Sequence, residues 1–165
     1  MNKIEVVSLS KQSRSKVGTP TLDASVVASG SKRFEKLIQK LARKILKVLN
    51  KNNVLVEIYL INGRKMRFLN KKFRGQDKTT TILSFEEPRN FILPASRFRK
   101  VGEIYLNAED SSFPPRARLA KGGRLQISRL LIHGLLHLFN YNHQKKNGRI
   151  KMERLENLVI RELGN

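Results

Sequence analysis

A chain of 165 residues, of which 39% are hydrophobic, has the size of one domain with a buried core and is too short for two. Its 34 Lys and Arg against 13 Asp and Glu give a formal net charge of +21, which favours a polyanion, nucleic acid first, as the partner. The absence of cysteine excludes disulfides and thiolate metal sites, and no stretch is apolar enough for a signal peptide or a membrane span. We therefore expect a soluble, cytoplasmic protein with no membrane contact. Organelle targeting by the Ser- and Lys-rich stretch 10–33 is the alternative.

The N-terminal part of the chain predicts a strand, an insertion and a helix. Residues 4–9 have the pattern of a short strand, whereas the basic, polar run 11–32 has too few large apolar residues to pack. We interpret 11–32 as a mobile insertion in a single domain that spans residues 1–165. From Phe34 to Val48 the apolar residues recur at helical spacing, which predicts an amphipathic helix with a basic outer face.

The rest of the chain predicts three strands and three helices. Residues 54–61 form a nearly continuous apolar run, typical of a strand buried on both faces, and Asn62 can cap a helix that ends near Arg74. Further strands are predicted over 79–85 and 103–107, between loops that contain proline. A long apolar helix over 126–139, opened by two glycines, and a closing helix to Leu163 complete an α/β or α+β fold.

All three histidines of the chain lie in one segment, at His133, His137 and His143. Residues four apart on a helix share a face, so the first two imidazoles can reach one cation. Asn140 tolerates the left-handed conformation that would turn the chain back and bring the third histidine to the same ion. Three neutral imidazoles suit zinc better than magnesium or calcium and leave a fourth position for water, which is a catalytic pattern. The alternative is two core histidines and one loop histidine without a metal.

The spacing H-x-x-x-H-x-x-x-x-x-H resembles that of the metzincin proteases, which carry a glutamate after the first histidine as general base. This chain has Gly134 at that position. Without a carboxylate there, peptide hydrolysis lacks its proton acceptor, so we expect a metzincin-like zinc helix with a different chemistry.

The segment HGLLHLFNYNH resembles the H-G-x-L-H-L-x-G-Y-D-H motif of the YbeY family, with Asn140 and Asn142 in place of its Gly and Asp. Residues 69–85 are similar, without a gap, to the family's L-N-x-x-[YF]-R-x-x-D-x-P-T-D-V-L-S-F, with threonines in place of its Pro and second Asp. Gly-Glu-Ile at 102–104 and the pair Met152 and Glu156 are further, weaker matches. The resemblance covers 54–163 and leaves 10–33 outside.

This resemblance implies a compact fold with a small mixed sheet packed against helices, and one zinc ion per chain. It also implies a single-strand-specific endoribonuclease that acts on ribosomal RNA in maturation and ribosome quality control, with small-subunit ribosomal proteins as further candidate partners.

Within this resemblance we assign roles to a few polar residues. Arg74 is the candidate catalytic residue and phosphate clamp, because its planar guanidinium suits phosphate. Asp77 would orient Arg74 or cap a turn. The candidate substrate contacts besides Arg74 are Lys78, Thr80 and Ser84. The threonine and the serine could equally have only a structural role at the edge of a strand.

The alternative function is a non-catalytic, zinc-stabilised assembly factor that binds ribosomal RNA or a small-subunit protein. It explains the charge equally well, and loss of turnover without loss of RNA affinity on Arg74→Ala would separate the two. A hydrolase for small molecules conflicts with so large a positive field.

Overall fold

The computed structural model describes residues 2–8, 24–88, 97–109, 121–143 and 146–164. In this part of the chain, four strands form one sheet in the order β1-β2-β4-β3 and four helices surround it. The strands are β1 Lys3–Ser8, β2 Val54–Ile61, β3 Ile82–Glu86 and β4 Arg99–Asn107, and the helices are α1 Ala24–Val48, α2 Gly63–Arg74, α3 Lys121–Leu138 and α4 Lys146–Gly164. Because β1, β2 and β4 are parallel and β3 is antiparallel, the sheet is mixed, and the expected α/β fold is confirmed.

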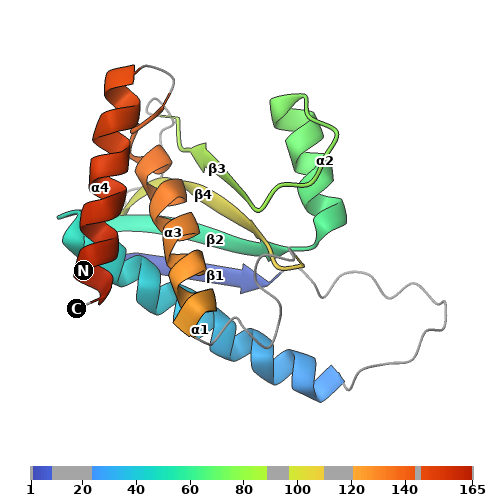
Figure 1. The fold of residues 1–165 in the computed structure, drawn as a ribbon. Coiled ribbons are helices and arrows are strands. Elements are labelled where there is room, and N and C mark those ends of the chain that lie inside the picture. The colour runs from blue at the N-terminus through green and yellow to red at the C-terminus, as the bar shows by residue number, and fades with distance from the viewer. Residues whose placement is uncertain (1, 9–23, 89–96, 110–120, 144–145, 165) are drawn as a thin grey trace.

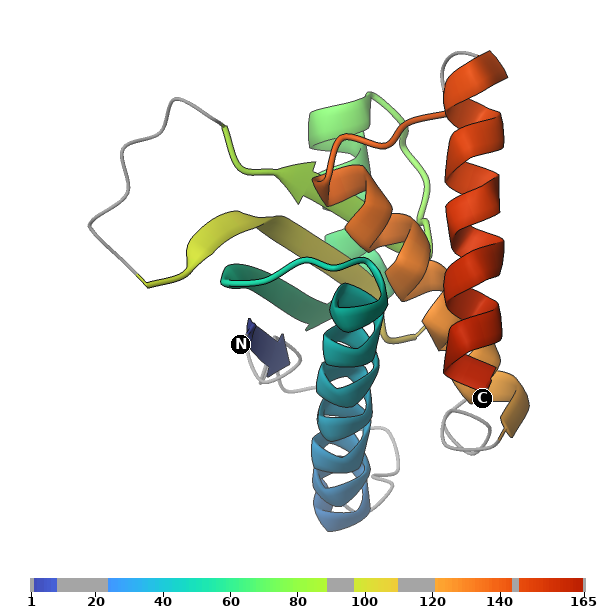
Figure 2. The ribbon, with the colours of Figure 1, turned by 90° about the vertical axis from the view of Figure 1, so that its left-hand side faces the viewer.

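The helices cover both faces of the sheet (Figure 1). Alternate residues of a strand point to opposite faces. Val56 and Ile58 therefore join the core under α1 and α3, whereas Tyr59 and Ile61 pack with α2 on the other side. Figure 2 shows α4 as an outer layer, farther from the sheet than α3. The sheet thus lies between one helix and a helical layer of three.

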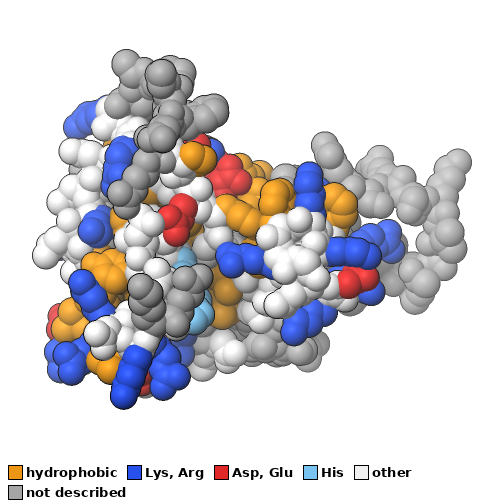
Figure 3. Space-filling model, turned by 90° about the horizontal axis from the view of Figure 1, so that it is seen from above, with side chains coloured by type: hydrophobic (Ala, Val, Ile, Leu, Met, Phe, Trp, Pro, Cys, Tyr) orange, Lys and Arg blue, Asp and Glu red, His pale blue; other side chains and the backbone are white. Residues whose placement is uncertain are grey.

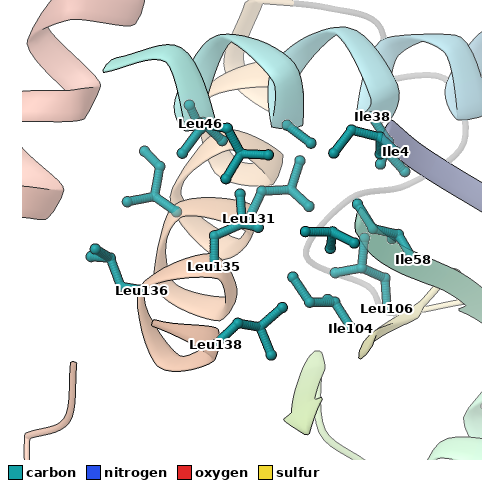
Figure 4. Packing of buried hydrophobic residues seen from close by; sticks show 14 of the residues in the cluster. Ile4, Ile38, Leu46, Ile58, Ile104, Leu106, Leu131, Leu135, Leu136 and Leu138 are labelled. Atoms are coloured by element: carbon teal, nitrogen blue, oxygen red, sulfur yellow. The ribbon is translucent and has the colours of Figure 1, made fainter. Parts of the chain in front are cut away.

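The main core holds α3 rigidly against the sheet. Leu131 and Leu135 of α3 are completely buried and meet Ile58 and Ile104 of the central strands (Figure 4). Each such side chain contributes about 1.5–3 kcal/mol when it leaves water. The helix that carries two of the histidines is therefore fixed by the best-packed part of the molecule.

Several boundaries differ from those expected. The first helix begins at Ala24 instead of Phe34, so part of the predicted insertion 11–32 is helical, and 9–23 lie outside the described residues. The mobility of the insertion stays a prediction. Helix growth is cooperative, so the well-packed turns after Phe34 extend into a Ser- and Ala-rich run that has only one glycine. For the same reason α3 starts at Lys121, and the two glycines expected to open it lie inside its first turn.

The two shorter strands also differ from expectation. β3 begins at Ile82 instead of Thr79, whereas β4 begins at Arg99, four residues before the expected start at Glu103. Pairing with the start of β2 draws Arg99 and Lys100 into the sheet despite their charge. No helix in the described ranges combines the length and the apolarity needed to cross a bilayer.

Gly102 lets β3, β4 and the end of α3 come together. Its φ of 143° lies outside the range of L side chains, and an added Cβ would stand 2.2 Å from the carbonyl oxygen of Phe85 and 2.9 Å from Leu138. The position follows a register shift between β2 and β4. A side chain here would strain the backbone and push β3 away from β4.

We predict that Gly102→Ala lowers the free energy of unfolding by about 2 kcal/mol or more. The cost of the strained backbone and the cost of the close contact with a fixed carbonyl are added together. The matched control is Gly122→Ala, which adds a methyl group in open space near the start of α3. Urea denaturation of both variants measures the difference. An equal effect of the two substitutions would contradict this account of Gly102.

Candidate metal centre

Two of the predicted metal ligands stand one helical turn apart on α3. His133 and His137 are half-buried, and their Nε2 atoms lie 3.1 Å from each other. In a tetrahedral zinc site with Zn–N bonds of 2.0–2.1 Å, two ligand nitrogens are about 3.3 Å apart. The pair therefore already has the separation that a shared ion requires.

The third histidine returns to this pair through the turn that ends α3. Asn140 has a φ of 65°, so its predicted left-handed conformation is confirmed. Its N–H donates to the carbonyl of His137 at 2.9 Å, and the N–H of Tyr141 donates to that of Leu136 at 3.1 Å, which together form a Schellman motif. The reversed chain places the ring of His143 5.1 Å from that of His137.

The three side chains form a group that could hold one metal ion. One nitrogen from each of His133, His137 and His143 lies within 4.8 Å of the other two, so a small side-chain adjustment would bring all three to one ion. Three imidazole nitrogens and no carboxylate favour zinc or another nitrogen-binding transition metal over magnesium and calcium. Burial, together with the neighbouring imidazoles of His133 and His143 and the charge of Arg74, lowers the pKa of His137 to about 4. His137 is therefore neutral at pH 7, the form in which imidazole binds a metal.

Glu156 of α4 orients the first histidine. Its carboxylate lies 2.8 Å from Nδ1 of His133, so that nitrogen carries the proton and Nε2 is left with a free lone pair. Glu156 matches the family motif, but no local pattern links it to a residue 23 positions earlier. Only the packing of α4 on α3 brings the two together.

Gly134 sets the distance between α3 and the sheet. A Cβ at this buried position would stand 2.8 Å from Ile82, 3.1 Å from the hydroxyl oxygen of Ser84 and 3.2 Å from Ile104. A glutamate here, as in a metzincin protease, would require the side chains of Ile82, Ser84 and Ile104 to shift. The close packing is thus consistent with a glycine in place of the general base.

Arg74 ends α2 and lies near the metal-ligand group. Its guanidinium donates a long hydrogen bond of 3.4 Å to the carbonyl of Ser84, and its charge contributes to the lowered pKa of His137. The expected pair of Arg74 with Asp77 is not formed. Asp77 instead accepts from Arg67 at 2.7 Å and from Lys71 at 3.0 Å, and these hydrogen bonds lower its pKa to about 2. Arg67 and Lys71 lie one turn apart on α2, so Asp77 can reach both at once.

The other predicted substrate contacts occupy different places. Thr80 lines a hollow together with His133, and the side chain of Ser84 faces Gly134, so both lie beside the histidines. Lys78 is exposed, and its carbonyl accepts a hydrogen bond of 2.8 Å from the buried amide of Asn70. The structure gives the lysine side chain no contact with the metal-ligand group.

The histidines are accessible from one face of the molecule. Figure 3 shows their side chains at the surface between lysine and arginine side chains on either side. A hollow of about 440 Å³ lies against His133 and His143, where α4 contributes Arg149, Glu153 and Glu156. The group is thus open to a large substrate.

Comparison with known proteins gives one family. A family model described as Endoribonuclease YbeY matches residues 23–164. The Endoribonuclease YbeY of Aquifex aeolicus is 32% identical over 127 residues, which cover 76% of this chain and 81% of that protein. The Endoribonuclease YbeY of Thermodesulfovibrio yellowstonii is 28% identical over 162 residues, 98% of each chain. A solution structure from Thermotoga maritima is similar with a TM-score of 0.45 and 20% identity, over 97% of this chain and 91% of that one.

The family match starts earlier than the resemblance drawn from the motifs. It includes residues 23–33 of the stretch 10–33 that was expected to lie outside, in agreement with the early start of α1. The histidine motif and the arginine segment both fall within it. The chain belongs to the YbeY endoribonuclease family, whose members are enzymes that cut phosphodiester bonds in RNA.

Proposed function

We propose that this protein is a zinc-dependent, single-strand-specific endoribonuclease that acts on ribosomal RNA during its maturation and in ribosome quality control. The observation that carries the proposal is the convergence of His133, His137 and His143 on one point beside Arg74. Three protein ligands and a fourth position for water or substrate are the pattern of catalytic zinc sites. Ribosomal RNA as substrate would place the activity in the cytoplasm.

The protein's own groups would prepare the site for a phosphodiester. When bound, zinc would supply a Lewis acid for a phosphate oxygen or for the attacking water. Glu156 keeps Nε2 of His133 directed at the ion, and the low pKa of His137 keeps that ligand neutral. These two effects act on the ligands and not on the substrate.

Arg74 is the candidate for stabilising the charge that gathers on the phosphoryl oxygens. A guanidinium has five N–H donors, and the single long bond to Ser84 leaves most of them available. Its planar fork can hold two phosphate oxygens at once, which a lysine cannot do. Lys78 and Thr80 would contact the RNA on either side, the lysine as a point charge and the threonine as a hydrogen-bond donor.

The net charge also favours RNA. Glu57, Glu87 and Glu103 surround the single ammonium of Lys100, at 3.0, 3.5 and 3.1 Å, and are partly neutralised by it. Glu153 and Glu156 line the hollow beside the histidines. With a net charge of +21, the chain as a whole still attracts a polyanion such as RNA.

The direct test removes one metal ligand. We expect wild-type protein to bind about one zinc per chain, as one three-histidine group requires, and to cleave a single-stranded ribosomal RNA fragment. His137→Ala should lose both the zinc, measured by mass spectrometry, and the cleavage. The control Gln126→Ala changes an exposed residue of the same helix and should keep both.

Two results would overturn the proposal in different ways. Wild-type protein without bound metal would refute the metal centre. Wild-type protein that holds zinc and binds the RNA fragment without cutting it would favour the non-catalytic assembly factor.

A second prediction concerns Arg74. Removal of a preorganised donor to transition-state charge typically costs about 10²–10³ in rate, so Arg74→Ala should slow cleavage by that factor. Its zinc content should be unchanged and its RNA affinity should fall less than tenfold, since one phosphate contact among many is lost. Single-turnover cleavage and filter binding measure the two effects.

The matched control is Arg64→Ala, which removes an exposed arginine from the first turn of α2 and lowers the net charge equally. It should cleave nearly as fast as wild type. Equal cleavage rates for the two variants would show that Arg74 contributes only to the overall positive charge of the protein.

A further inference from the structure

A second hollow lies against the His133–Glu156 pair, and the reaction proposed above uses only Thr80, His133 and Glu156 of its lining. Its volume is about 440 Å³, within the range of small-ligand sites. The segment that leads into β3 and the helices α3 and α4 line it, and His133 and Glu156 line both hollows. Whatever occupies this hollow is therefore adjacent to the metal-ligand group.

The walls of this hollow combine apolar side chains with a few polar ones. Ile82, Ile132 and Ile160 come from three different elements and supply the apolar surface. Arg129 and Asn157 project from neighbouring helices at its solvent-exposed part. An apolar pocket with a few convergent polar groups is the usual form of a site for a small planar or aromatic ligand.

The lining suits a neutral ring better than a phosphate. Its two charged groups outside the metal-ligand group, Arg129 and Glu156, have opposite signs, so the hollow offers an anion no excess of positive charge, whereas a neutral ring would meet the apolar walls without penalty. A guanidinium plane such as that of Arg129 can stack on a nucleobase, and the amide of Asn157 can both donate to and accept from its edge. These groups suit the base of a nucleotide and not its backbone.

We propose that this hollow binds one unstacked nucleobase of the RNA, next to the phosphate that is cut, with Asn157 as the specificity-determining residue. The inference rests on the proposed function, since the RNA must first lie across the metal-ligand group. Single-stranded RNA is recognised through bases that are splayed out and bound on their edges. An asparagine amide pairs in bidentate fashion with adenine, so adenine is the favoured base.

The first experiment cuts a pool of single-stranded RNAs that carry all four bases at each position. Wild-type protein should prefer one base at a fixed distance from the cut by about tenfold, the scale of one bidentate contact. Asn157→Leu replaces an exposed side chain with one of similar size and should abolish the preference. Ile160→Trp should fill the hollow and should also abolish the base preference. The control Asn147→Leu changes an exposed asparagine of α4 outside the hollow and should keep the preference.

A second measurement separates the failure of the pocket from the failure of the proposed function. A single-stranded oligonucleotide with 2-aminopurine beside the preferred adenine reports by its fluorescence whether that adenine leaves the stack, whether or not cleavage occurs. Binding to wild-type protein should change the fluorescence, and binding to Asn157→Leu should change it much less. The pocket is refuted if wild type shows no base preference, if both hollow variants keep it, or if the fluorescence change is the same in wild type and Asn157→Leu. Absence of cleavage by wild type with an intact fluorescence difference would refute the nuclease and leave the base pocket standing.

Discussion

The candidate centre depends on how closely α3 approaches the sheet. Gly134 lies between the two helical histidines, and any side chain there would press on Ile82 and Ser84 of β3. Because the core around Leu131 and Leu135 is tightly packed, the helix has little freedom to move outward. The two imidazoles are thus held beside β3, near the end of α2 where Arg74 lies.

Gly134 also separates the protein from the proteases whose histidine spacing it resembles. A metzincin-like helix with a glycine at the position of the base lacks the proton acceptor of those proteases. The lost group is consistent with a reaction that depends more on charge stabilisation than on a general base. Phosphodiester cleavage has this character, since its transition state gathers charge on phosphoryl oxygens.

Much of the local structure could be predicted because local signals agree with the packing. The continuous apolar run of β2 ends at Asn62, whose side chain accepts from the N–H of Lys65 at 2.9 Å, so both the strand and the next helix begin and end where expected. Asn140 likewise has the backbone conformation that its residue type favours. In both places the type of one residue favours the backbone conformation that the structure has.

The features that could not be predicted arise between elements. Glu156 reaches His133 only through the packing of α4 on α3, and Asp77 prefers Arg67 and Lys71 to Arg74 because of how α2 presents them. The early start of α1 reflects cooperative growth from a packed helix and not the composition of the added residues. The hollow lined by Arg129 and Asn157 joins segments far apart in the sequence, so no spacing rule could reveal it.

We propose above all that a helix and the turn after it bring three histidines to one catalytic metal ion. X-ray absorption at the zinc edge of the loaded protein is the decisive test of this arrangement. We predict three imidazole nitrogens and one exchangeable oxygen, all at about 2.0–2.1 Å. Fewer than three imidazoles, or a fourth protein ligand that closes the site, would contradict the account.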